Sequence, residues 1–520
     1  MSENLLIKNL LTAAAFDHPV EQCKLLETHI SWIILTGNYA YKIKKPVDFG
    51  FLDYSTLAKR KFYCEEEVRL NQFLASELYL SVVSINGSET NPKINGTGDI
   101  LEYAIKMREF SQENLFSTLL QQKKLTPKLI DQLAELIAQF HLTTPVAKAD
   151  SIFGTPEHVH APVVQNFDQI LPLLTADADK QQMLALQKWS EQQYKQHYAV
   201  FQARKQQGFI RDCHGDLHLG NIILFQQKPL LFDRIEFNDD LRWNDVMADI
   251  AFLAMDLAER QEFSSAKRLL NKYFSITGDY QGLTILPYYQ AYRAVVRAKI
   301  SLFHAQQTNL STTEKQALLQ KYRDFMQLAE TYTRAAQPIL FITYGVTGSG
   351  KSTLAEVVAT EMGALQIRSD IVRKRLLGLT PTAQTNSAVN QGIYDAQTTE
   401  NTYAELVKLA QTTLQAGYPV IIDAAFLKAH WRENFQQLAH KLNVPFVILH
   451  CHAPRPQIES WITERLAQQK DPSEAYLAVL DMQEASAETL TAAEQPYVIT
   501  TDTRAINTTE LMQQIKHKIG

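Results

Sequence analysis

The sequence predicts two domains of different fold class: a mixed α+β domain over residues 1–335 and an α/β domain with a parallel sheet over residues 336–520. Three observations support this prediction. The first 110 residues mix short apolar runs with one charged helical segment, and helical periodicity dominates from about residue 243 to residue 332. After residue 338, apolar runs alternate with helical stretches, which is typical of a parallel sheet covered by helices on both faces.

Length and composition are those of a folded protein with more than one domain. The 520 residues are 45% hydrophobic and 21% charged, with a formal net charge of −5. This charge argues against a globally basic nucleic-acid binder, although a local basic patch stays open. The four cysteines form no CxxC pair, and neither a signal peptide nor a run of 18 apolar residues is present. We therefore expect a cytoplasmic protein without a membrane partner. The oligomeric state stays open.

Short apolar runs predict the strands of the first domain. Residues 31–43 are expected to form two strands around a turn at residues 36–38, because glycine and asparagine suit a tight reversal. Further strands are expected at residues 101–110, 221–225 and 230–232.

Helices are expected where the apolar period lengthens or the composition is helical. Residues 58–74 have a helical composition, and from residue 127 to 140 apolar side chains recur on one helical face. In the second domain, five apolar runs predict the strands, at residues 339–344, 365–367, 420–422, 446–449 and 497–500.

A phosphate-binding loop is predicted at the start of the second domain. The segment from Gly345 to Ser352 matches G-x-x-x-x-G-K-[ST], with a strand before it and a helix after it. Glycines let backbone N–H groups surround a polyphosphate, while Lys351 reaches the β- and γ-phosphates and the Ser352 hydroxyl holds Mg²⁺. The nucleotide-binding candidates are Gly345, Gly348, Ser349, Gly350, Lys351, Ser352 and Thr353.

Two carboxylates follow later strands of this domain. Asp370 comes three residues after the predicted strand 365–367, at a point that faces the end of the nucleotide where an acceptor hydroxyl would sit, and it is our candidate catalytic base. Arg368 and Arg373 could neutralise an anionic acceptor. Asp423 ends the apolar run 420–422, the position of a carboxylate that supports Mg²⁺, alongside Ser352.

On these residues, the region from about 338 to 518 resembles the P-loop small-molecule kinases that include gluconate kinase, zeta-type toxins and polynucleotide 5′-kinases. Arg432 and a lid-like segment that contains Arg465 and Asp471 add to the resemblance. It implies that Arg465 contacts the nucleotide. Such lids usually carry a second arginine, and here Lys470 stands in that stretch, without the bidentate fork of arginine.

A second catalytic motif lies in the first domain. Asp216 is followed five residues later by Asn221, just before a short strand, and Asp233 comes twelve residues further on. This is the spacing of a kinase catalytic loop, in which Asp216 acts as the base and Asn221 and Asp233 hold metal.

The motif from His214 to Asn221, with Asp249, resembles the aminoglycoside phosphotransferase/choline kinase-like branch of the protein-kinase fold. The resemblance covers about residues 25–320. It implies a two-lobed domain, with Asp249 beneath the catalytic loop and residues 102–110 as the hinge that binds adenine. The regulatory phenylalanine after the metal aspartate is replaced by arginine, and the glycine-rich loop is reduced to residues 36–38.

The same resemblance implies a phosphate-binding lysine and a glutamate that pairs with it. Lys42 is the first choice for the lysine because it alternates with apolar neighbours, and Lys44 is its rival on the same face. The glutamate is expected among residues 65–67, with Glu66 preferred and Glu67 as the alternative.

Taken whole, the chain resembles the bacterial fusion proteins that join an aminoglycoside phosphotransferase-like domain to a P-loop kinase domain. The resemblance implies an ATP- and Mg²⁺-dependent phosphotransferase with two nucleotide sites and hydroxyl acceptors that the sequence does not identify. Two alternatives stay open: a nucleic-acid 5′-hydroxyl kinase in the second domain, or one domain that serves as a nucleotide-binding regulatory module.

Overall fold

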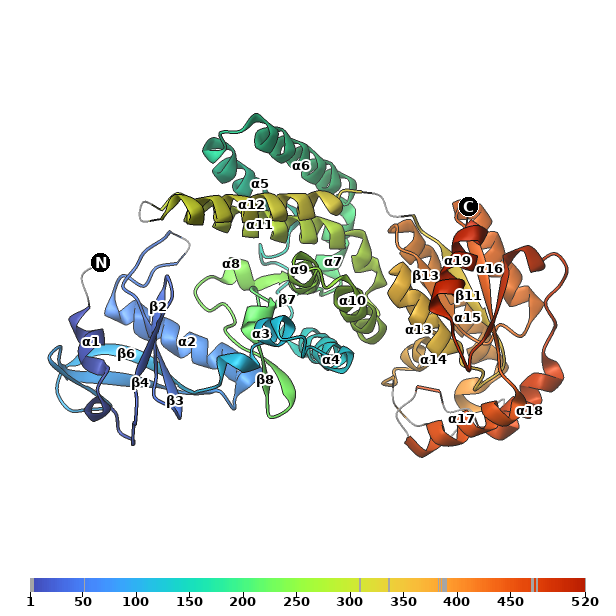
Figure 1. The fold of residues 1–520 in the computed structure, drawn as a ribbon, viewed down its shortest axis with the longest axis horizontal. Helices are drawn as coiled ribbons and strands as arrows, with labels where there is room; N and C mark the ends of the chain where they lie inside the picture. Colours follow the sequence, from blue (N-terminus) through green and yellow to red (C-terminus); the bar gives the residue numbers. More distant parts are fainter. Residues whose placement is uncertain are drawn as a thin grey trace. The chain divides into compact units, whose positions relative to one another are not determined.

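The computed structural model describes residues 4–519 apart from residues 51, 308–309, 335–336, 382, 384, 386–390, 469–471 and 474–475. The chain divides into two compact units (Figure 1). One consists of residues 1–260 and 292–326, and the other of residues 261–291 and 327–520. The boundary expected near residue 335 falls on residues outside the description, so it stays a prediction. No helix in the described residues is long and apolar enough to cross a membrane.

The first unit opens with an antiparallel sheet of six strands. Its strand order is β1-β2-β3-β6-β4-β5. The bounds are β1 Lys24–Glu27, β2 Ser31–Leu35, β3 Tyr39–Lys44, β4 Tyr79–Ser88, β5 Asn91–Ile94 and β6 Ile100–Arg108. The predicted reversal between β2 and β3 is confirmed, and so is the helix α2, Leu57–Ala75, which packs on β4 and β6. The sequence missed β1, β4 and β5.

The rest of the first unit is largely helical. The helices are α1 Leu5–Leu10, α3 Phe116–Gln121, α4 Pro127–Thr143, α5 Pro156–Ile170, α6 Asp177–Gln196, α7 Tyr198–Gln206, α8 Asp239–Arg242 and α9 Val246–Glu259. Strand β7, Ile210–Asp212, pairs with β10, Trp243–Asp245, and β8, Ile222–Phe225, forms a hairpin with β9, Lys228–Leu231. The strand β10 corrects the expectation of helix from residue 243, because antiparallel pairing with β7 satisfies its backbone.

The connecting helices are α10 Phe263–Thr277, α11 Leu286–Ala305 and α12 Thr312–Thr331. Helix α10 belongs to the second unit, where it packs against the strand β12, Leu365–Arg368. There the side-chain oxygen of Asn271 accepts a hydrogen bond of 3.0 Å from the Gln366 amide. Because β12 is an edge strand, this bond satisfies a backbone donor that the sheet leaves open.

The second unit contains the predicted parallel sheet, with strand order β12-β13-β11-β14-β15. Every pairing in this sheet is parallel. The remaining strands are β11 Leu340–Tyr344, β13 Val420–Asp423, β14 Phe446–His452 and β15 Val498–Asp502. All five predicted strand positions are thus confirmed.

Helices cover both faces of this sheet (Figure 1). The helices that follow β11 in the chain are α13 Lys351–Met362, α14 Ser369–Leu376, α15 Ala396–Gln415, α16 Ala429–Leu442, α17 Arg455–Gln468, α18 Leu477–Ser486 and α19 Thr508–Ile519. Helices α13 and α19 enclose one apolar core with Phe341, Val447 and Ile499, and α15 and α16 lie against the other face at β13 and β11. The predicted α/β class is confirmed.

Candidate active sites

The catalytic loop of the first unit is held from below by the buried helix α9. Asp249 on this helix accepts hydrogen bonds from the amides of His214, at 2.6 Å, and Gly215, at 3.0 Å. Two helical turns further, Asp256 accepts from the Leu219 amide at 3.0 Å. The predicted place of Asp249 is confirmed, whereas the role of Asp256 was not foreseen.

Asp216 and Asn221 lie together at the centre of this loop. The side-chain amide of Asn221 donates to the backbone oxygen of Asp216, at 3.0 Å, and to its carboxylate, at 3.2 Å. His218 Nε2 lies 3.4 Å from the same carboxylate. Burial raises the pKa of Asp216, but the charge and hydrogen bond of His218 outweigh it and hold this pKa below its usual range. The carboxylate is therefore ionised near neutral pH.

Asp233 follows the β8–β9 hairpin in a left-handed backbone conformation, with φ 62°. Its amide donates to the Tyr79 hydroxyl at 3.1 Å, and the preceding Phe232 amide donates to the Asn221 carbonyl at 3.1 Å. These contacts place the Asp233 carboxylate beside the catalytic loop, with its side chain 41% exposed. Amide and carboxylate oxygens of this kind suit Mg²⁺, so Asn221 and Asp233 fit the metal that the sequence predicted.

Lys42 on β3 connects Asp233 to helix α2. Its ammonium lies 2.7 Å from Glu67 Oε1 and 2.5 Å from Asp233 Oδ1. Burial lowers the pKa of Lys42, but Asp233 and Glu67 outweigh it and raise this pKa well above its ordinary value. Lys44 contacts Glu67 and Glu236 instead, so Lys42 is the lysine that reaches the metal aspartate.

The choice of Glu66 as the partner of Lys42 is wrong. Glu66 pairs with Arg69 on its own helix, at 2.6 Å, and Glu67 makes the contact with Lys42. The inward face of α2 contains Cys64, Glu67 and Asn71, and Glu66 lies about 100° away around the axis, toward solvent. The helical spacing from Cys64 to Asn71 was the signal that could have identified Glu67.

In the second unit, the phosphate loop joins β11 to α13, which begins at Lys351. Gly348 and Gly350 have φ of 74° and 80°. A Cβ at Gly348 would lie 2.7 Å from Ile462, and one at Gly350 would lie 2.7 Å from Thr503. Both positions therefore need glycine for conformation and for space. Gly345, Ser349, Ser352 and Thr353 lie in the same strand–loop–helix segment.

Two polar side chains of this loop lie in a buried setting. The ammonium of Lys351 donates to the Val346 carbonyl at 2.6 Å, and burial lowers the pKa of Lys351. The Ser349 hydroxyl is buried and has no hydrogen-bond partner among the described residues. Both the Lys351 ammonium and the Ser349 hydroxyl can donate hydrogen bonds to the oxygens of a bound phosphate.

Asp423 ends β13 at the carboxyl edge of the sheet, close to the loop. Gln366 on β12 donates to its carboxylate at 2.9 Å, and Arg368 Nε lies 3.7 Å from the same oxygen. Gln366 also donates to the Ser352 carbonyl at 3.3 Å, which connects the two predicted metal residues. A serine hydroxyl and a carboxylate fit Mg²⁺. The sequence missed Gln366, because nothing in the apolar run around it marked a polar contact.

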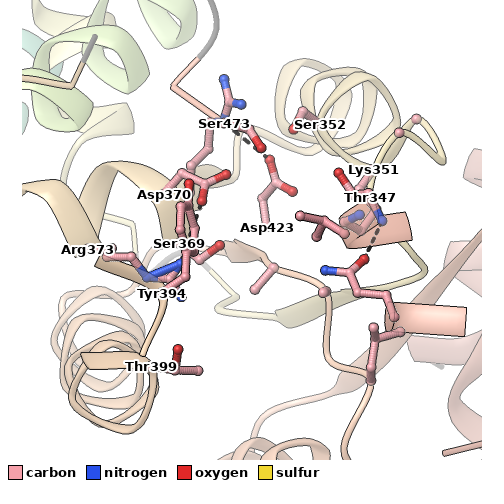
Figure 2. A pocket seen from close by; sticks show the side chains of 18 of the residues that line it. Thr347, Lys351, Ser352, Ser369, Asp370, Arg373, Tyr394, Thr399, Asp423 and Ser473 are labelled. Carbon is pink, nitrogen blue, oxygen red and sulfur yellow. Dashed lines mark hydrogen bonds and ion pairs between the residues drawn. The ribbon is translucent and has the colours of Figure 1, made fainter. Parts of the chain in front are cut away.

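Lys351, Ser352, Arg368 and Asp423 line a cavity of about 600 Å³. Figure 2 shows Asp370 and Arg373 on one side of it, Lys351 and Thr347 on the other, and Asp423 between them. Arg373 lies 3.8 Å from Asp370 and over the ring of Tyr394. The cavity thus brings together the predicted phosphate loop, metal carboxylate and candidate base.

Arg432 and the residues of the lid-like segment, which also supported the resemblance, have different places. Arg465 on α17 lines the cavity, as the sequence expected. Arg432 does not, because its guanidinium is buried against Glu494 at 2.6 Å and donates to the Phe426 carbonyl. Lys470 and Asp471 lie outside the described residues. Arg432 therefore stabilises the fold through these buried contacts and does not line the cavity.

One further group of potential metal ligands occurs in the described residues: His141, Cys213 and Asp249. Both carboxylate oxygens of Asp249 already accept hydrogen bonds from the catalytic loop. Burial raises the pKa of the Cys213 thiol well above its ordinary value, and a thiol must lose its proton to bind metal. This group therefore supports the loop.

Curated relatives match nearly the whole chain. The chain is 29% identical over 483 residues to the uncharacterized protein Rv2004c of Mycobacterium tuberculosis and to the uncharacterized protein Mb2027c of Mycobacterium bovis. Each match covers 91% of this chain and 93% of the relative.

Solved structures match one part of the chain or the other. A choline/ethanolamine kinase family protein from Mesorhizobium loti is 12% identical, with a TM-score of 0.36, and the match covers 63% of this chain and 97% of that one. A gluconokinase from Sinorhizobium meliloti is 18% identical, with a TM-score of 0.24, and the match covers 35% of this chain and 93% of that one.

Two family models match two successive parts of the chain. The model described as phosphotransferase enzyme family matches residues 60–286, and the model described as AAA domain matches residues 340–490. The first range contains the catalytic loop and Asp233, and the second contains the phosphate loop and Asp423. The chain is therefore a phosphotransferase that is similar over residues 60–286 to the phosphotransferase enzyme family and over residues 340–490 to the AAA domain.

Proposed function

We propose that this protein transfers the γ-phosphate of ATP to hydroxyl acceptors at two separate sites, one in each domain. Both sites contain a lysine for phosphate, oxygen ligands for Mg²⁺ and a carboxylate that can act as a base. Bound Mg²⁺ neutralises charge on the β- and γ-phosphates. The observation that carries the proposal at the first site is the position of Lys42, between Glu67 and Asp233.

At the first site, Asp216 orients the acceptor hydroxyl and takes its proton. Its low pKa suits a residue that acts mainly by orientation and accepts the proton late in the transfer. Asn221 and Asp233 supply the metal ligands, and Lys42, held by Glu67, binds the phosphates. Residues 102–110 supply the expected adenine-binding hinge.

At the second site, the loop from Gly345 to Thr353 surrounds the phosphates, and Lys351 is released from Val346 to contact them. Ser352 and Asp423 supply metal ligands, and Asp370 is the candidate base. Arg465 contacts the nucleotide from the lid. The position of Lys351, Ser352, Asp370, Asp423 and Arg465 around one cavity supports this assignment.

The acceptor of the second domain is a small anion that carries a hydroxyl group. Arg373 supports this assignment, since it lies beside Asp370, has a side chain only 8% exposed and leaves its Nε without a hydrogen-bond partner among the described residues. A buried guanidinium with an open donor favours an anionic ligand.

A nucleic-acid acceptor is less well supported. The cations of α14 do not form one basic surface, because Lys374 donates to the Pro472 carbonyl at 2.8 Å and Arg375 to the Ser275 carbonyl at 2.6 Å. Arg368 and Arg373 are the α14-region cations that line the cavity in the described residues. A 5′-hydroxyl oligonucleotide therefore serves as a comparison substrate in the test.

The test is transfer of labelled phosphate from ATP to the small molecules of a cell extract, with 5′-hydroxyl oligonucleotides as a separate substrate. We expect one set of products to disappear in Asp216→Asn and a different set in Lys351→Ala. Lys408→Ala is the control, since Lys408 is 74% exposed on α15 and lies outside the cavity. If both the Asp216→Asn and Lys351→Ala variants kept all transfer, the proposal would fail.

The same experiment separates the regulatory alternative. If the Lys351→Ala variant lost nucleotide binding at the second domain but no labelled product, that domain would serve as a nucleotide sensor. Loss of oligonucleotide labelling in Asp370→Ala would favour the nucleic-acid kinase.

A further inference from the structure

A second lysine of β3 lies in a buried ion-pair network behind the first site. Lys44 is two residues from Lys42, so both side chains project from the same face of the strand. The Lys44 side chain is 1% exposed, and its ammonium donates to Glu67 Oε2 at 2.6 Å, to the Tyr54 hydroxyl at 3.2 Å and to Glu236. An ammonium has three donors, and each has an acceptor here.

This network controls the orientation of Glu67. One carboxylate oxygen of Glu67 contacts Lys42 at 2.7 Å and the other contacts Lys44 at 2.6 Å, and the side chain is fully buried. Burial raises the pKa of Glu67, but the two lysines outweigh it and lower this pKa. Because the two oxygens have different partners, Glu67 cannot rotate toward one lysine without losing the other.

Glu236 connects the network to the segment that contains the metal aspartate. It lies three residues after Asp233, and its carboxylate contacts both Lys44 and the Tyr54 hydroxyl. The same segment is bound to α2 by the Arg234 amide, which donates to Asn71 Oδ1 at 2.8 Å. Movement of Glu236 would therefore disturb both the metal segment and the helix that carries Glu67.

The residue after Asp233 also binds the segment to the catalytic loop. Arg234 lies 2.6 Å from the Asp212 carboxylate and donates to the Cys213 carbonyl at 2.8 Å. These contacts of the buried Arg234 fix the segment after Asp233. The resemblance to protein kinases implies a mobile phenylalanine at this position, and a phenylalanine could not make the same ion pair.

We propose that Lys44 and Glu236 are positioning residues of the first site, and that their ion pair holds Glu67 and the Asp233 segment in the arrangement that binds MgATP. The inference rests on the proposed nucleotide site of the first domain. It assigns no contact with substrate to either residue, since both act through Glu67 and Asp233.

The test uses the full chain with Lys351→Ala, so that MgATP binding reports on the first site. In this background, Lys44→Met is expected to weaken MgATP binding at least tenfold, measured by calorimetry at a temperature where circular dichroism shows a folded protein. Adding Glu236→Gln to Lys44→Met removes the unpaired buried carboxylate, and we expect it to restore part of the loss. Tyr54→Phe, which removes one hydroxyl and keeps the ring, should weaken binding about threefold.

The matched control is Arg204→Met, which breaks a different buried ion pair of the same unit, between Arg204 and Asp245 at 2.7 Å. We expect it to lower the melting temperature while MgATP affinity stays within twofold. For each variant, the loss of MgATP affinity is compared with the drop in melting temperature. If Lys44→Met and Arg204→Met lost the same affinity per degree of melting temperature, the inference would be overturned. If Lys44→Met does not fold, Tyr54→Phe and Glu236→Gln decide, and unchanged affinity in both would overturn it.

MgATP binding by the Lys351→Ala protein itself separates failure of the proposed nucleotide site from failure of the positioning role. If the Lys351→Ala protein bound no MgATP, the nucleotide site of the first domain would fail, and the positioning role with it. If it bound MgATP and the Lys44→Met and Tyr54→Phe variants bound it equally well, only the positioning role would fail.

Discussion

The Lys42 ammonium lies 2.7 Å from Glu67, whereas the neighbouring Glu66 pairs with Arg69 on its own helix. Two adjacent residues of α2 thus make different contacts, one a buried ion pair with β3 and the other an ion pair at the helix surface. We expect Glu67→Gln to destabilise the protein by about 3–5 kcal/mol, because it leaves two buried lysines with one anionic partner fewer. It should also abolish MgATP binding at the first site.

Glu66→Gln is the control for this prediction, because its ion pair with Arg69 is exposed. It should change the free energy of unfolding by less than about 1 kcal/mol. Urea denaturation and calorimetric titration with MgATP measure both variants. A larger effect of Glu66→Gln than of Glu67→Gln would contradict the assignment.

Gly348 is expected to tolerate no side chain. Alanine there would keep the left-handed φ of 74° and place its Cβ 2.7 Å from Ile462. The backbone conformation alone costs about 1–2 kcal/mol. We expect Gly348→Ala to displace the loop and weaken nucleotide binding at the second site more than tenfold, in a protein in which Lys42→Met removes the phosphate-binding lysine of the first site. Gly417→Ala, also at positive φ but with open space around its Cβ, should leave that binding unchanged.

Lys351 is predicted to reduce the stability of the second domain near neutral pH. Burial lowers its pKa below the ordinary 10.5, so the folded state holds the proton less tightly than the unfolded state. Below the folded pKa the charged lysine opposes folding, and this penalty disappears as the pH rises through the folded pKa toward 10.5. We expect Lys351→Met to raise the free energy of unfolding by about 1 kcal/mol at neutral pH, with loss of nucleotide binding.

The pH dependence provides the check on this prediction. The advantage of Lys351→Met over the parent should shrink as the pH rises from neutral to about 10, in urea titrations of the two proteins. An advantage that grew with pH would show that burial does not set the proton affinity of Lys351.

Asp423 is predicted to be required for the response of the second site to Mg²⁺. Its carboxylate lies at the end of β13, with Gln366 2.9 Å away as a hydrogen-bond donor. In a protein with Lys42→Met, which removes the phosphate-binding lysine of the first site, we expect Asp423→Asn to remove the extra stabilisation that Mg²⁺ adds to ATP, while stabilisation by metal-free ATP in EDTA persists. Gln366→Leu should leave the Mg²⁺ response and reduce the affinity several-fold. Thermal unfolding with each nucleotide measures this, and equal responses of Asp423→Asn to ATP with and without Mg²⁺ are the expected result.

The sequence could predict those features whose residues lie close together in the chain. The phosphate loop was evident because its glycines, lysine and serine are contiguous and lie between a strand and a helix. The spacing from Asp216 to Asn221 and Asp233 was equally local, and the alternation after residue 338 predicted a parallel sheet. In each case the chemistry depends on residues that are close in the chain, so a short pattern contains the information.

Contacts between distant segments were decided by the tertiary structure alone. Which of two adjacent glutamates reaches Lys42 depends on the rotation of α2 against the sheet, and that rotation is set by packing of its buried face. Glu236, Tyr79 and Gln366 had no signal because their partners lie 192, 154 and 57 residues away. The sequence by itself determined which catalytic parts this protein has. Packing decided which side chains meet, since burial leaves a charged group stable only where the fold supplies a partner.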